Sequence, residues 1–221
     1  QTKDSLLSIV NLIRQSKKSF DKVTDYAVAG RYLVLIRQED GLKNLIISDA
    51  TAKKRYTEKS IIEFKISPDK NMVAVTTYTD GSYFVKNITL GEKISIHHIY
   101  QNASAQCKRL AWSSDSKSLA FLQTGDKSSE LYCYRLDDEK MISFRPFDKT
   151  NFPKNSYIDA GQPLDFSKDN RRIFFKMRQI ISPINTTSRS DVQIWNAADK
   201  WIYSAEQIIK GWTVNPKIGM F

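Results

Sequence analysis

The chain has 221 residues and a formal net charge of +10, from 34 Lys and Arg residues against 24 Asp and Glu residues. Hydrophobic residues make up 41% and aromatic residues 11% of the sequence, which excludes an intrinsically disordered chain and allows a hydrophobic core. No apolar run approaches the roughly 20 residues that cross a bilayer, so we expect no membrane span. The length fits one large or two small domains.

The basic residues are spread along the chain and do not form one cluster. Short runs occur at 17–18, 53–55 and 171–172. A nucleic-acid interface usually concentrates its charge on one face or helix, and no zinc-finger, RNP or basic-helix pattern accompanies these runs. We therefore expect a solvated basic surface and no nucleic-acid partner.

The N-terminal segment, residues 1–21, is expected to form a helix. Its apolar residues Leu6, Ile9, Val10 and Ile13 follow the i, i+3, i+4, i+7 spacing of one helical face. Such a helix either packs on the chain's own sheets or docks onto a partner.

A repeated phrase follows, in which an apolar stretch, a Ser-x-Asp turn and a second apolar stretch succeed one another. It occurs at Phe64–Val75, Leu110–Phe121 and Leu164–Phe175. A repeat of roughly 40–50 residues is typical of propeller blades with four strands each. Ser and Asp side chains can bond their own backbone and so fix a turn. We expect structural turns at Ser67, Asp69, Ser113, Asp115, Ser167 and Asp169.

Strand signals surround these turns. Asp40-Gly41 and Asp80-Gly81 each separate two β-rich segments, which predicts hairpins. The predicted fold class is an all-β propeller of four-stranded antiparallel blades, about four blades plus a partial one, with one N-terminal helix. The propeller is expected to span residues 22–221. The blades are expected at about 22–59, 60–100, 104–146 and 155–205, and the remaining residues resemble the start of another unit.

The phrase Ser67–Val75, with the hairpin after it, resembles the blades of TolB-like and dipeptidyl-peptidase-like propellers. The Gly-His and Trp-Asp signature of WD40 blades is absent from the sequence. The segment Ser190–Gln207 is similar to part of the propeller of bacterial prolyl-oligopeptidase-type (S9) peptidases. The resemblance covers most of residues 22–207. The matching positions are Asp191, Trp195, Asp199 and Gln207.

The resemblance implies a non-catalytic propeller that filters or positions peptides for an α/β-hydrolase domain of the same parent chain. That hydrolase would carry a G-x-S-x-G nucleophile turn, and no glycine of this chain makes the pattern. The alternative is a stand-alone propeller that serves as a protein-interaction module. The expected partners are peptide substrates or the hydrolase domain, and identical chains in a homo-oligomer. The expected location is periplasmic or secreted, and a cytoplasmic location stays open.

No catalytic, cofactor-binding or metal-binding residue is expected in this chain. His97 and His98 are adjacent on a predicted strand and so point to opposite faces, which disfavours a shared metal. Cys107 and Cys133 are not at zinc-like spacing, and we expect two buried free thiols.

Overall fold

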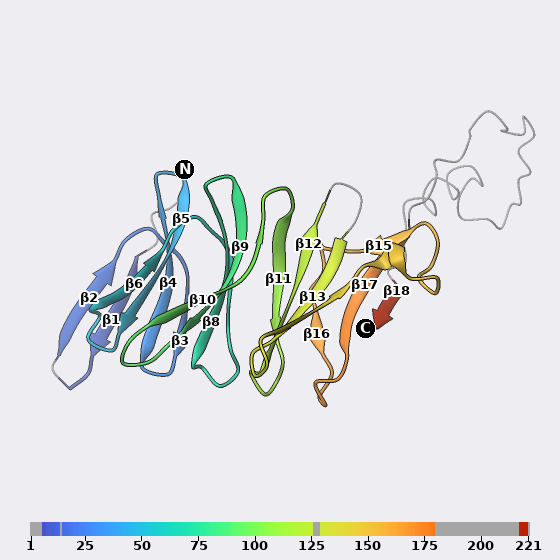
Figure 1. Cartoon of the computed structure of the whole chain (residues 1–221). Helices are drawn as coiled ribbons and strands as arrows, with labels where there is room; N and C mark the ends of the chain where they lie inside the picture. Colours follow the sequence, from blue (N-terminus) through green and yellow to red (C-terminus); the bar gives the residue numbers. More distant parts are fainter. Residues whose placement is uncertain (1–5, 14, 126–128, 180–216, 221) are drawn as a thin grey trace, which may run out of the picture.

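The computed structural model describes residues 6–13, 15–125, 129–179 and 217–220 (Figure 1). Within them the chain forms antiparallel sheets and one turn of 3-10 helix, η1 (Pro146–Asp148). The sheets lie side by side in chain order, each with a face turned toward the next (Figure 1). This arrangement confirms the predicted all-β propeller class.

The first three sheets are four-stranded meanders, in which each strand pairs with the next along the chain. The first sheet contains β3 (Val23–Ala29), β4 (Tyr32–Glu39), β5 (Leu42–Asp49) and β6 (Lys54–Glu58). The second contains β7 (Ile61–Ile66), β8 (Met72–Thr79), β9 (Ser82–Thr89) and β10 (Ser95–Asn102). The third contains β11 (Gln106–Trp112), β12 (Ser118–Thr124), β13 (Ser129–Arg135) and β14 (Lys140–Phe144).

Two Asp-Gly turns join the second and third strands of the first two sheets, as predicted. Asp40 and Gly41 have φ angles of 50° and 78°, and Asp80 and Gly81 have φ angles of 51° and 75°. Two successive residues with positive φ define the turn whose twist matches antiparallel strands. Aspartate and glycine tolerate this conformation, which explains why the sequence signal was reliable here.

The fourth sheet departs from the meander. Its first strand is split into β15 (Ser156–Ile158) and β16 (Asp165–Phe166), which pair with the two ends of β17 (Ile173–Gln179). The strand β18 (Lys217–Met220) pairs with β17. The expectation that the last residues begin another unit is therefore wrong for β18, which adds to the fourth sheet. Residues 180–216, with the predicted third and fourth strands of this unit, lie outside the described part, so the blade boundaries stay a prediction.

The predicted N-terminal helix is wrong. The segment forms a hairpin of β1 (Leu7–Asn11) and β2 (Ser16–Phe20). Leu7 and Ile9 pack with Phe20 on the outer face of the first sheet, whereas Val10 is 55% exposed. The burial thus alternates with the period of two that a strand has. Several closely spaced apolar residues fit both periods, and contact with the first sheet selects the strand.

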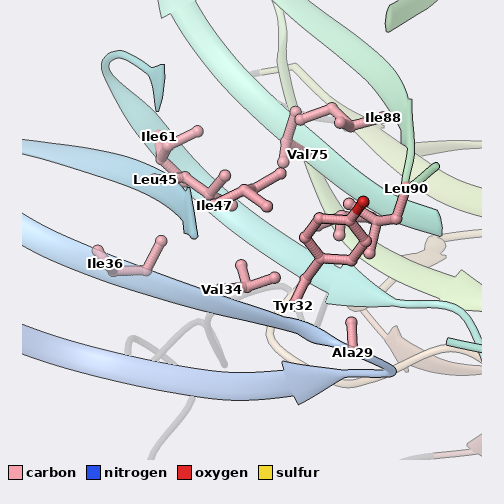
Figure 2. Packing of buried hydrophobic residues seen from close by; sticks show 11 residues of the cluster. Ala29, Tyr32, Val34, Ile36, Leu45, Ile47, Ile61, Val75, Ile88 and Leu90 are labelled. Atoms are coloured by element: carbon pink, nitrogen blue, oxygen red, sulfur yellow. The ribbon is translucent and has the colours of Figure 1, made fainter. Parts of the chain in front are cut away.

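The core lies between neighbouring sheets. Between the first and second sheets, Val34 and Ile47 meet Val75 and Ile88, and all four side chains are fully buried (Figure 2). The other face of β4 packs under the β1–β2 hairpin. The strand β4 is therefore buried on both faces, which requires its nearly continuous apolar sequence.

Candidate functional site

Each Ser-x-Asp phrase forms the turn between the first and second strands of its sheet. In the second sheet, the hydroxyl of Ser67 donates to the carboxylate of Asp69 (2.5 Å) and accepts the N–H of Met72 (2.9 Å). The carboxylate of Asp69 also accepts the N–H of Asn71 (3.1 Å). The two side chains thereby bond the backbone of their own turn.

The third and fourth sheets repeat these bonds. The hydroxyl of Ser113 donates to Asp115 (2.6 Å), and the hydroxyl of Ser167 donates to Asp169. The residue after each aspartate has positive φ, at 62° for Lys70, 62° for Ser116 and 56° for Asn170. A non-glycine residue in this conformation costs about 1 kcal/mol, which the side-chain bonds of the turn offset.

The turn carboxylates are held in the charged form. In the third and fourth sheets, the serine hydroxyl of the same turn is the main cause that lowers the pKa of Asp115 and Asp169. Burial raises the pKa of Asp69. The hydrogen bonds from its serine and from Asn71 together lower this pKa by more than burial raises it, so the net pKa lies below its ordinary value. Ionised carboxylates accept the stronger hydrogen bonds, which favours this turn geometry.

The turns of neighbouring sheets bond to one another. The N–H of Asp69 donates to the hydroxyl of Ser116 in the next sheet (3.0 Å). The N–H of Ser114 donates to the side-chain oxygen of Asn170 in the sheet after that (3.0 Å). We call this series of first-to-second-strand turns the turn row. It joins three sheets at one end through polar contacts.

A second polar network links the first strands of the sheets. The carboxylate of Glu63 on β7 accepts the N–H groups of Arg109 (2.6 Å) and Leu110 (3.1 Å) on β11. Arg109 has a φ of 63° and lies in an irregularity of the β11–β12 pairing. Its guanidinium donates to the carbonyl oxygens of Ala160 (2.6 Å) and Gly161 (2.9 Å), before β16. One residue thus bridges three sheets.

Asp159 completes this network in the fourth sheet. Its carboxylate accepts the N–H of Gly161 (2.9 Å) and a guanidinium N–H of Arg178 (3.0 Å). Burial raises the pKa of Asp159, but these two donors lower it more, so the net pKa is below the ordinary value. The connection between β15 and β16 is therefore fixed around a charged, buried side chain.

The two histidines have different partners. Nε2 of His97 lies 2.9 Å from the hydroxyl of Tyr134 in the third sheet, whereas the ring of His98 forms a T-shaped pair with Phe84 in its own sheet. Within the described ranges, no group of three or more His, Cys, Asp or Glu residues is placed to hold a metal ion.

The structure confirms two buried free thiols. Burial raises the pKa of Cys107 to about 12. Burial also raises the pKa of Cys133, to about 11, against a lowering effect of Arg135. A thiol with so high a pKa carries little thiolate near neutral pH and is a poor nucleophile.

The sequence identified the serine and aspartate columns of the turns but not the first-strand network. Glu63, Arg109 and Pro163 occupy the same position, four residues before the serine of each phrase. Three different residue types at one position leave no repeat signal. The positions Asp191, Trp195, Asp199 and Gln207 of the peptidase resemblance lie outside the described residues.

The serine hydroxyls of the turns donate to carboxylates of their own turns rather than facing an imidazole base. Both networks link neighbouring sheets through hydrogen bonds between side chains and backbone groups, which is the chemistry of a scaffold. The described residues also include no helix with the length and apolar character of a membrane span.

Searches against family models and against curated proteins found no match. Solved structures with this fold do match. The β-propeller domain of the trilobed protease from Pyrococcus furiosus matches with a TM-score of 0.51 and 17% identity, over 78% of this chain and 51% of that chain. TolB from Acinetobacter baumannii matches with a TM-score of 0.52 and 13% identity, over 80% and 46%. An oligogalacturonate lyase in complex with manganese matches with a TM-score of 0.51 and 11% identity, over 76% and 50%.

These similarities show that the chain has a β-propeller fold, of the kind found in TolB and in the propeller domain of a protease. The chain spans about half the length of each of these three structures.

One prediction concerns the turns. Replacing Asp115 with alanine is expected to lower the free energy of unfolding by about 0.5–2 kcal/mol, because the turn loses one side-chain acceptor. Urea denaturation measures the change. Asp165→Ala, which removes an exposed aspartate from β16, is the matched control and should stay within about 0.5 kcal/mol of the parent. Equal midpoints for the two variants would argue against the turn assignment.

Asp115→Ala should also change how the free energy of unfolding depends on pH in acid. The folded-state pKa of Asp115 is lowered, so its stabilisation is present above the unfolded value of 3.8 and is lost as the pH falls through the folded value. The difference in stability between the parent chain and Asp115→Ala should therefore shrink as the pH is lowered from 3.8 through the folded-state pKa of Asp115.

Proposed function

We propose that this chain is the non-catalytic propeller of a prolyl-oligopeptidase-type peptidase, and that it filters or positions peptide substrates for a hydrolase domain elsewhere in the parent protein. The observation that carries the proposal is the agreement between two independent signals. The repeated phrase at Ser67–Val75 resembles blades of this class, and the fold matches the propeller domain of the trilobed protease. A periplasmic or secreted location belongs to the same proposal.

The scaffold suits such a role. The turn row and the Glu63–Arg109 network bond neighbouring sheets at defined points, so the sheets hold a fixed spacing. A filter needs this rigidity, since its selectivity depends on a constant opening. The stand-alone interaction module is the second candidate. The fold of TolB, which is not named as a peptidase, matches this chain as well as the protease propeller does.

The proposal predicts that the chain alone carries no serine nucleophile. An activated serine needs an adjacent base, and the serines of the repeat donate to carboxylates instead. Incubation with a fluorophosphonate probe, read by mass spectrometry, should leave every serine unlabelled. Stoichiometric labelling of one serine would overturn the non-catalytic assignment. An active prolyl oligopeptidase treated in parallel is the positive control.

A further inference from the structure

The tip of the β1–β2 hairpin presents two aliphatic side chains to solvent. Leu12 is 87% exposed and Ile13 is 94% exposed, the highest values among the large hydrophobic residues of the described part. The N–H of Ile13 donates to the side-chain oxygen of Asn11 (3.1 Å), which shapes the tip. The hairpin packs on the first sheet through other residues, so these two add nothing to the core.

The tip lies at the same end of the molecule as the turn row. The ammonium of Lys18 donates to the carbonyl oxygen of Ala52, in the turn between β5 and β6 (2.5 Å). In a meander, that turn and the first-to-second-strand turn lie at one end of the sheet. Figure 1 shows the hairpin tip and the turns of all four sheets along its lower side. A Cβ on Gly30 would lie 3.9 Å from the carbonyl oxygen of Lys70, so the first sheet continues the turn row.

This end carries exposed positive charge. The bases of the turn row are all exposed, namely Arg31, Lys70, Lys117, Lys168, Arg171 and Arg172. The three aspartates of the row accept hydroxyl and N–H donors of their own turns, and Asp169 also pairs with Arg172 (3.5 Å). On the hairpin, Lys17 pairs with Val10 on the face turned away from the first sheet.

Besides the turn-row aspartates, exposed acidic side chains at this end are Glu92, in the turn between β9 and β10, and a run on the third sheet. The turn between β13 and β14 contains residues 137–139, all acidic. Asp137 pairs with Lys117 (3.1 Å), and Asp138 pairs with Arg135 (3.2 Å). Lys17, Arg31 and Lys70 lie on the hairpin, the first sheet and the second sheet, away from this run of acidic residues.

We propose that this end of the propeller docks on an anionic lipid surface. Leu12 and Ile13 enter the boundary between headgroups and acyl chains, and Lys17, Arg31 and Lys70 lie over the headgroups. Adjacent aliphatic side chains beside basic residues fit a membrane interface, where apolar burial and attraction to anionic lipid add together. A nucleic acid would use the charge but not the aliphatic tip. The inference is independent of the proposed peptidase role.

The test is co-sedimentation of the full chain with vesicles. One set contains phosphatidylcholine alone, and in the other about a third of the lipid is phosphatidylglycerol. We expect binding to the anionic vesicles that weakens with added salt, and little binding to the neutral ones. Leu12→Ser combined with Ile13→Ser should lower binding at least about tenfold, because both side chains lose apolar burial. Lys70→Ala should lower it about fivefold.

Matched controls come from the opposite end of the first sheet. Leu42 is 53% exposed, and Lys43 is exposed beside it, at the turn between β4 and β5. Leu42→Ser and Lys43→Ala should leave vesicle binding unchanged. No binding to anionic vesicles, equal loss in the control variants, or retention of a duplex oligonucleotide in place of vesicles would each overturn the proposal. Circular dichroism of every variant establishes that it is folded.

Discussion

Replacing Lys86 with methionine is expected to lower the free energy of unfolding by about 3–5 kcal/mol, because it leaves a buried carboxylate without its cation. The ammonium of Lys86 lies 2.8 Å from the carboxylate of Glu58, and the two side chains are only 12% and 10% exposed. The pair joins β9 of the second sheet to β6 of the first. In the variant, Tyr56 is the hydrogen-bond donor that still reaches Glu58.

Urea or thermal denaturation measures this effect, and two further variants define it. Adding Glu58→Gln to Lys86→Met removes the unpaired charge and should restore part of the lost stability. Lys117→Met breaks a pair whose side chains are 60% and 62% exposed, and should change stability by less than about 1 kcal/mol. If Lys86→Met is as mild as Lys117→Met, the buried pair does not hold the first two sheets together.

Replacing Glu63 with alanine is the second change with a large expected effect. Its carboxylate accepts two consecutive backbone N–H groups, those of Arg109 and Leu110, and Leu110 is 5% exposed. A backbone donor that loses its partner near the core costs about 1–3 kcal/mol. We expect the free energy of unfolding to fall by about 2–4 kcal/mol, measured by urea denaturation.

Hydrogen exchange separates this mechanism from a general loss of packing. In Glu63→Ala, hydrogen exchange should speed up relative to the parent chain more at the amides of Arg109 and Leu110 than at those of β13 in the same sheet. Glu63→Gln keeps one acceptor oxygen and should fall between the parent and the alanine variant. Glu92→Ala removes an exposed carboxylate and is the matched control. Unchanged protection at both amides would show that Glu63 does not cap them.

The repeat made the propeller class predictable from the sequence, because the side chains that form the repeat also form the turns. A Ser-x-Asp turn is a local structure, and its bonds span only a few residues. Asp-Gly hairpins are local in the same sense. Local chemistry of this kind can be read from one chain without knowledge of its partners.

The errors arose where distant contacts decide the structure. The N-terminal segment has a helical stripe, yet Leu7 and Ile9 form a strand because the first sheet offers them an apolar face. The assignment of β18 to the fourth sheet depends on its pairing with β17, which its own sequence does not specify. Contact with another sheet overrides local preference in both cases.

The polar networks between sheets follow the same rule. Glu63 bonds to residues 46 and 47 positions later, and Arg109 to residues 51 and 52 positions later. No short motif spans such distances. Only the stacking of the sheets brings these groups together. The sequence therefore predicted the turns of the candidate site but not the network between the first strands.

The most direct test of the central claim is the mass of the natural protein. An antibody raised against this chain, which has a mass of 25.4 kDa, would capture it from its own cells after fluorophosphonate labelling. We predict a polypeptide much heavier than 25.4 kDa, with the probe on a serine in a G-x-S-x-G peptide outside these 221 residues. A captured polypeptide of 25.4 kDa that carries no probe would contradict the peptidase assignment and favour the stand-alone module.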